Sequence, residues 1–173
     1  MPNWVSADVE LIGKKKDLDD FVAKAKGYYP EYIDGNNRKD GRDFSYFCFN
    51  NYIPIPREVL SNGYNKINAK KDGGYEWQIN NWGSKWHPEF KKPLSPQIER
   101  AKKVGDLYKL CLSFETAWSP IFPVFNAVSA AHPGLRITYA FRDEMGNVEG
   151  DAEWKGGKML YEDFRDYPAE EEE

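Results

Sequence analysis

The chain has 173 residues, of which 40% are hydrophobic and 30% charged, and its formal net charge is −4. This size and balance are typical of a single domain that buries a core. Aromatic residues make up 16% of the chain, which excludes global disorder because disordered segments contain few aromatics. The apolar stretches are far shorter than the ~20 residues that cross a bilayer, so we expect no membrane-spanning helix. No basic region followed by an apolar run opens the chain, so we expect no signal peptide and a cytoplasmic protein.

The negative charge is concentrated at the C-terminal end. Residues 162–173 hold seven acids and one base, so the rest of the chain is near neutral. We therefore divide the sequence into one domain over 1–167 and an acidic tail over 168–173. Two Cys and two His are scattered singly, whereas structural zinc usually takes four such ligands at short spacings. We predict no metal site and no cofactor.

Alternating and helical patterns predict the first elements. Residues 4–12 alternate apolar and polar side chains, which predicts a half-buried strand. A helix with Asp17 as its N-cap and a stop near Gly27 follows, because apolar residues recur there at helical spacing. Residues 44–50 are apolar at nearly every position, which predicts a second strand. The prolines within 52–56 then indicate an extended exit from the sheet.

The next part, residues 57–106, is rich in tryptophan, glycine and proline, and we interpret it as an insertion of short elements. Within it we expect helices over 74–82 and 95–104. The patterns after the insertion predict a strand over 107–116, a helix that opens at Ser119-Pro120, and strands over 135–142, 148–154 and 158–164. This order predicts an α+β, ferredoxin-like fold: an antiparallel sheet with two helices on one face and a C-terminal hairpin extension.

Four motifs occur in a recognisable order: PNW at 2–4, FNNYIPIP at 49–56, NWGSKW at 81–86 and FETAWSP at 114–120. With them the chain resembles the YubB ferredoxin-like family of phage and plasmid accessory proteins, over roughly residues 2–164. The resemblance implies a ferredoxin-like fold and an origin in mobile elements. It implies no settled activity.

A cluster of tryptophans near the insertion is the main candidate site. Trp82 and Trp86 are four residues apart and would share one face of a helix, where Trp118 could approach them. Such rings can stack a planar group, and Lys85 could hold an anionic one. The alternative is a closed aromatic core that fixes the insertion to the sheet. The candidate ligand- or partner-binding residues are Trp77, Trp82, Lys85, Trp86, His87, Arg100, Lys102, Lys103, Glu115 and Trp118.

Two further side chains are candidates for chemistry. Glu115 at a strand end could bind a cation or a ribose hydroxyl, or form an ion pair with Lys85 or Arg136. His87 is the better candidate for a general base, and together with Glu115 it defines an enzyme hypothesis. The sequence has no nucleophile elbow, no phosphate-binding glycine loop and no His-Glu-x-x-His motif. We therefore predict no catalytic residues.

The favoured hypothesis is a non-catalytic accessory protein of a phage or mobile element in a host bacterial cell. It would bind a host protein stoichiometrically, for example as an inhibitor of host defence. The alternative is a nucleotide or cyclic-nucleotide binder. In it the rings of Trp82, Trp86 and Trp118 would stack the nucleobase, and Lys85 with Arg100, Lys102 or Lys103 would hold the phosphates. A nucleic-acid-binding module is the second alternative, which outward-facing acids such as Asp8 and Glu10 disfavour.

Overall fold

The computed structural model describes residues 3–33, 44–64, 73–94 and 107–166. Its main sheet has five strands in the order β4-β1-β5-β6-β7, and every neighbouring pair is antiparallel. The strands are β1 (Trp4–Gly13), β4 (Tyr108–Ala117), β5 (Arg136–Asp143), β6 (Val148–Lys155) and β7 (Lys158–Asp166). The strands predicted from alternation are thus confirmed, with bounds that shift by at most two residues.

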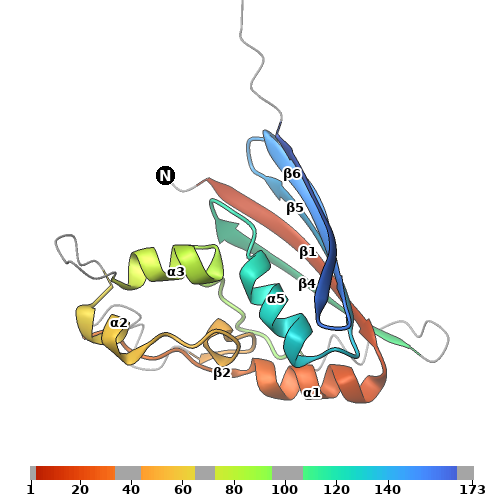
Figure 1. Ribbon diagram of the computed structural model, residues 1–173, viewed down its shortest axis with the longest axis horizontal. Helices are drawn as coiled ribbons and strands as arrows, with labels where there is room; N and C mark the ends of the chain where they lie inside the picture. The colour runs from red at the N-terminus through yellow and green to blue at the C-terminus, as the bar shows by residue number, and fades with distance from the viewer. Residues whose placement is uncertain (1–2, 34–43, 65–72, 95–106, 167–173) are drawn as a thin grey trace, which may run out of the picture.

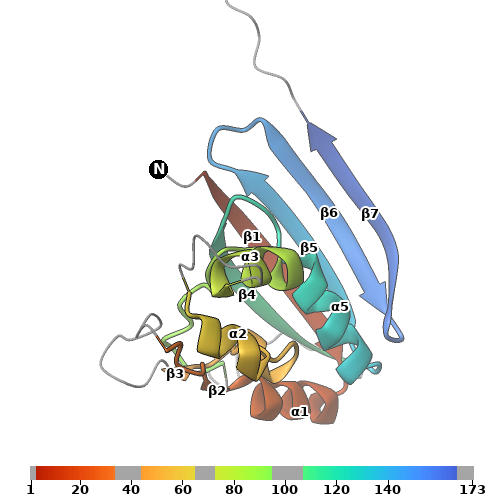
Figure 2. The same cartoon turned by 60° about the vertical axis from the view of Figure 1, so that its left-hand side comes forward.

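The helices α1 (Lys15–Ala25), α2 (Arg57–Asn62), α3 (Gly74–Trp82) and α5 (Phe122–Ala131) lie on one side of this sheet (Figure 1, Figure 2). The other side carries no described helix. This α+β arrangement confirms the predicted ferredoxin-like fold, including the C-terminal hairpin formed by β6 and β7. Helix α3 has the bounds that the sequence predicts, and the insertion opens with the short helix α2.

The second strand predicted over 44–50 is wrong. Within it only Phe44–Ser45 form a strand, β3. This strand pairs with β2 (Gly27–Tyr28) in a separate two-stranded sheet and precedes the short 3-10 helix η1 (Phe49–Asn51). The side chains of residues 47–49 are all fully buried, and the Cys48 N–H donates to the Ala25 carbonyl. A short apolar run buried on all sides has no diagnostic period, so its pattern cannot distinguish a strand from an irregular segment.

Two predicted helix starts are also displaced. Helix α1 begins after Lys14, so Asp17 lies inside the helix and is not its N-cap. The Asp17 carboxylate packs closely against Gly134, where an added Cβ would lie 2.7 Å from one carboxylate oxygen. Helix α5 begins after Ile121, because the Ser119 hydroxyl is used elsewhere, donating to the Gly83 carbonyl. The helix predicted over 95–104 and the tail over 168–173 lie outside the described residues.

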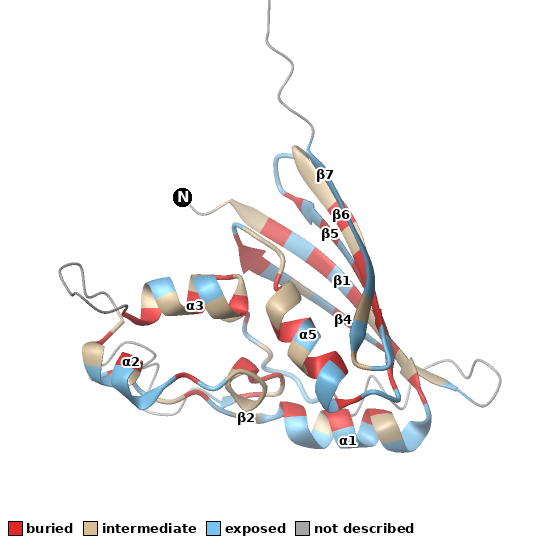
Figure 3. Cartoon of the chain, in the orientation of Figure 1, coloured by how far each residue is buried: buried red, intermediate tan, exposed pale blue. Residues whose placement is uncertain are grey.

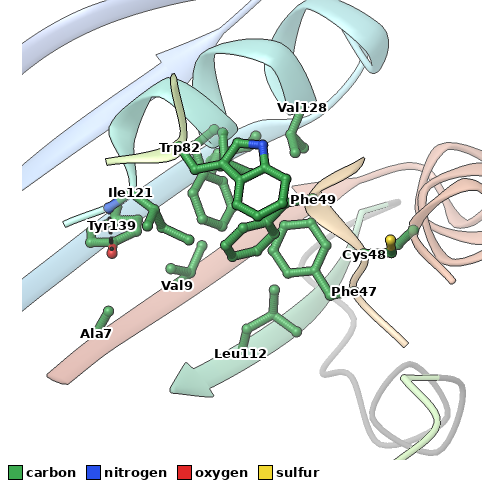
Figure 4. Close-up of a cluster of buried hydrophobic side chains, with 14 of the residues drawn as sticks. Ala7, Val9, Phe47, Cys48, Phe49, Trp82, Leu112, Ile121, Val128 and Tyr139 are labelled. Carbon is green, nitrogen blue, oxygen red and sulfur yellow. Dashed lines mark hydrogen bonds between the residues drawn. The ribbon is translucent and has the colours of Figure 1, made fainter. Parts of the chain in front are cut away.

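The core is a layer of aromatic rings between the sheet and the helices (Figure 4). Strand β1 turns Val9 and Leu11 into this layer and exposes or half-exposes the alternate positions, as the banding in Figure 3 shows. The Phe49 and Trp82 rings pack edge to face at 5.7 Å. The Trp82 indole N–H donates to the Ile53 carbonyl at 3.0 Å, which satisfies its polar atom. The described part of the insertion is therefore held to the sheet by the same core.

Replacing Trp82 with alanine should destabilise the protein by about 3–5 kcal/mol, because the indole is fully buried among other rings. Urea denaturation of Trp82→Ala measures this loss, with Trp86→Ala as the control, since Trp86 is 37% exposed. Equal losses in free energy of unfolding for the two variants would contradict this assignment of Trp82 to the core.

His132 ends helix α5 and should titrate below its ordinary pKa of 6.5. Burial and the nearby Lys24 charge lower the pKa, whereas Asp17 and Asp20 oppose the shift less strongly. The folded state therefore binds this proton less readily than the unfolded state. The free energy of unfolding should rise with pH between the folded-state pKa and 6.5. An NMR titration of the ring checks this, and a pKa at or above 6.5 would contradict it.

Candidate functional site

A turn after helix α3 brings part of the predicted cluster to the end of the sheet. Gly83 adopts a positive φ of 84°, and its N–H donates to the Ile79 carbonyl, so the helix stops at Trp82. A Cβ at Gly83 would lie 2.9 Å from the Pro120 carbonyl oxygen. Both the φ value and this close approach favour glycine. Trp82 and Trp86 therefore do not share a helix face, contrary to the prediction.

Hydrogen bonds fix the segment 83–86 against the end of β4. The Ser84 hydroxyl donates to the Trp86 carbonyl at 2.9 Å, and it accepts the Ala117 N–H at 3.3 Å. The Tyr64 hydroxyl donates to the Lys85 carbonyl. The backbone that carries Lys85 and Trp86 is therefore anchored on both sides, which limits the number of positions that these side chains can take.

Trp118 follows β4 and has a strained backbone. Its φ of 76° is positive, and no other described non-glycine residue has a positive φ. The Trp118 N–H donates to the Asn3 carbonyl at 2.8 Å, so the strand pairing between β4 and β1 continues into this residue. Bulky residues rarely occupy this region, and such strain is concentrated at functional sites. The geometry presents the indole at the surface, where half of its area is exposed.

These turns assemble a surface group that we call the tryptophan patch: Trp4, Lys85, Trp86 and Trp118. Trp86 and Trp118 are exposed, whereas Trp4 and Lys85 are half-buried. The Trp4 and Trp86 ring centroids are 6.0 Å apart. The Lys85 ammonium lies 4.3 Å from the Trp86 ring centroid and 4.0 Å from that of Trp118. Both distances are within the range of cation–π attraction, so the charge is held between two indoles. The patch therefore combines exposed apolar faces with one fixed positive charge.

A buried carboxylate, that of Asp143, holds the residue that precedes Trp4 of the patch. The Asp143 side chain accepts the Asn3 side-chain amide at 3.1 Å and the Val148 N–H at 3.0 Å. Burial acts to raise the pKa of Asp143, but these and other donors in the same turn outweigh it and lower the pKa below 3.8. Asp143 is therefore ionised at neutral pH and holds Asn3, the residue before Trp4.

The other predicted site residues that the structure describes do not join the patch. Trp82 is fully buried, and Trp77 packs against it with ring centroids 5.5 Å apart. The His87 ring stacks on Tyr29 at 3.5 Å on the helix side of the sheet, whereas Glu115 is exposed on the other side. A joint catalytic role for His87 and Glu115 therefore has no geometric support. The remaining candidates, Arg100, Lys102 and Lys103, lie outside the described residues.

Trp4 is the patch residue that the sequence analysis did not include in the site. The register of β1 with β4 places Trp4 opposite Ala117, the residue before Trp118. Periodicity alone does not supply this register. Three predicted residues, Lys85, Trp86 and Trp118, do come together.

Two absences hold for the residues that the structure describes. No helix among them is both long and apolar enough to cross a membrane. Within the same ranges, no three His, Cys, Asp or Glu side chains are grouped so that they could hold a metal ion.

Comparisons with known proteins add a family to this geometry. The family model described as "Ferredoxin-like domain in Api92-like protein" matches residues 81–173. The crystal structure of the protein Api92 from Yersinia pseudotuberculosis aligns with a TM-score of 0.60 at 10% sequence identity, covering 98% of this chain and 99% of that one. No curated protein matches. These matches confirm the ferredoxin-like part of the resemblance seen in the sequence; neither match is described as a YubB or mobile-element protein.

The strain at Trp118 can be tested by two substitutions at one position. Trp118→Gly and Trp118→Ala both remove the ring, but only glycine adopts a positive φ without steric cost. We expect Trp118→Gly to be the more stable variant by about 1 kcal/mol in urea denaturation. Equal stability, or a more stable alanine variant, would contradict strain at this residue.

Proposed function

The chain belongs to the family of Api92-like proteins with a ferredoxin-like domain, and we propose that it acts without catalysis by binding a partner protein through the tryptophan patch. The observation that carries this proposal is the pair of exposed indoles with the Lys85 ammonium between them. Tryptophan is enriched among the residues that dominate binding energy at protein interfaces.

The rigidity of the patch supports the same proposal. The hydrogen bonds of Ser84 and Tyr64 fix the backbone under Lys85 and Trp86, and the Asn3 carbonyl fixes that of Trp118. A surface that is ordered before binding loses less conformational entropy when a partner arrives. The patch itself consists of three indoles and one ammonium group, a set suited to contact rather than to proton transfer.

We extend the proposal to the origin of the protein and its partner. The resemblance of the four motifs to phage and plasmid accessory proteins favours a mobile-element protein that acts in the cytoplasm of a bacterial host. A host protein, such as a component of a defence system, would then be the partner. The resemblance alone supports this part.

A second candidate is the binding of a nucleotide or cyclic nucleotide. The observation that favours it is the position of Lys85, which could neutralise a phosphate while a base stacks on Trp118. Trp82 cannot take part in such stacking because it is fully buried. The slot would therefore offer two exposed rings rather than the three that the sequence predicts.

Affinity capture with the intact protein tests the proposal. Immobilised protein is incubated with bacterial host lysate, beside the double variant Trp86→Ala/Trp118→Gly and the control Tyr28→Ala, which removes an exposed ring elsewhere. We expect one protein to be retained in stoichiometric amounts by the unmodified chain and by Tyr28→Ala. The double variant should bind it at least about thirtyfold more weakly.

Two results would overturn the proposal. One is equal retention of that protein by the double variant, and the other is the lack of any stoichiometric partner at micromolar bait. Quenching of tryptophan fluorescence by added mono- or cyclic nucleotides, lost in the double variant, would instead favour the second candidate.

A further inference from the structure

The outer face of the sheet, opposite the helices, is the second surface that the described elements leave open (Figure 1, Figure 2). The exposed or half-exposed side of β1 carries Ser6, Asp8 and Glu10, which alternate with core residues. The strand register places Ala140 of β5 beside Asp8, and Asp151 of β6 beside Ala140. The small side chain of Ala140 on β5 thus lies between the carboxylates of Asp8 on β1 and Asp151 on β6.

This arrangement produces a hollow of ≈ 480 Å³ on the outer face. Thr138 and Ala140 line it together with one basic side chain, that of Arg165. Four carboxylates also line the hollow: Asp8, Glu10, Glu149 and Asp151. Its walls therefore hold more negative than positive charge.

Ion pairs within the sheet neutralise only part of that charge. Glu10 pairs with Lys109, Asp151 accepts Arg165 at 3.1 Å, and Glu149 lies 3.7 Å from Arg165 and 3.9 Å from Arg142. Asp8 is the fourth carboxylate. Asp8 is exposed and accepts the Ser113 hydroxyl at 2.6 Å, but no base in the described ranges lies within 4 Å of it. The negative charge of Asp8 is therefore not balanced by a described basic side chain, and it attracts cationic groups from outside the chain.

The hollow and the tryptophan patch belong to one surface. Trp4 and Asp8 are both on β1 with the same parity, so their side chains leave the same face of the sheet. At a rise of about 3.3 Å per residue, they are roughly 13 Å apart along the strand. A partner segment that contacts the patch can therefore extend over the hollow without leaving the sheet.

We propose that the outer face binds an arginine-bearing segment of a partner protein, which lies along β1 with its guanidinium groups over the acidic hollow. This inference rests on the proposed protein-binding function of the patch. A guanidinium pairs with carboxylates through two parallel hydrogen bonds, and it also stacks on indoles. Nucleic acid is a poor fit, because the four carboxylates repel phosphate.

Binding of a labelled peptide to the intact protein tests the inference. The probe is a short fluorescein-labelled peptide with a leucine at one end and arginines from the fourth residue onward, beside a version with glutamates in place of the arginines. We expect the arginine probe to bind and the glutamate probe not to bind. Asp8→Asn keeps the bond from Ser113 and removes only the charge, so it should weaken binding about threefold.

A matched control separates the hollow from general attraction. Asp19→Asn makes the same charge change at an exposed position of helix α1, and it should leave the affinity unchanged. Equal weakening by Asp8→Asn and Asp19→Asn, no effect of Asp8→Asn, or tighter binding of a single-stranded oligonucleotide would overturn the inference.

The two proposals fail separately in this experiment. If Trp86→Ala/Trp118→Gly weakens binding of the arginine probe and Asp8→Asn does not, the patch binds and the inference about the hollow is wrong. If Asp8→Asn weakens binding and the double variant does not, the hollow binds the cation without the patch, and the proposed function of the patch is wrong.

Discussion

Strand β1 is paired along its full length with β4 and over Val5–Ile12 with β5, and the rest of the structure depends on this double ladder. A strand with neighbours on both sides has fixed register, because a slip of one residue would move its apolar side chains to the opposite face. The alternation of β1 therefore defines an inner face, which the aromatic rings cover, and an outer face, which they leave open. Trp4 is the first residue of the outer series.

The large aromatic content of the chain serves both faces of this arrangement. Trp82 closes the core, whereas Trp86, only four residues later, is exposed at the end of the sheet. The difference follows from Gly83, whose positive φ ends α3 and redirects the chain toward Ala117. A continuous helix would have placed both rings on one side. The same glycine thus separates a tryptophan that stabilises the fold from one that is available to a partner.

The sequence predicts the elements whose pattern has a clear period. Strands β1, β4, β5 and β6 alternate, and Gly83 marks the end of α3, so these elements are found close to their true bounds. The segment 44–50 is different, because burial of three consecutive side chains removes any period. The start of α5 was displaced for another reason: the hydroxyl of Ser119 caps a distant carbonyl instead of its own helix.

The candidate site was predicted in part, and its missing components depend on tertiary contacts. Lys85, Trp86 and Trp118 are recognisable as an unusual aromatic and basic group, but Trp4 joins them only through the register of β1 with β4. The acidic hollow depends on Ala140 lying between Asp8 and Asp151 on three adjacent strands. Neither strand order nor register can be obtained from the composition of one strand, so the hollow could not be predicted.

We propose that Trp86 and Trp118 form a binding surface, whereas Trp82 and Trp154 of β6, which are both fully buried, belong to the core. Hydroxyl-radical footprinting with mass spectrometry reads each tryptophan separately in the intact protein. We expect rapid oxidation of Trp86 and Trp118 in the free protein, slow oxidation of Trp82 and Trp154, and protection of the first pair when the partner protein is bound. Slow oxidation of Trp118 in the free protein, or no change at Trp86 and Trp118 on partner binding, would contradict this proposal.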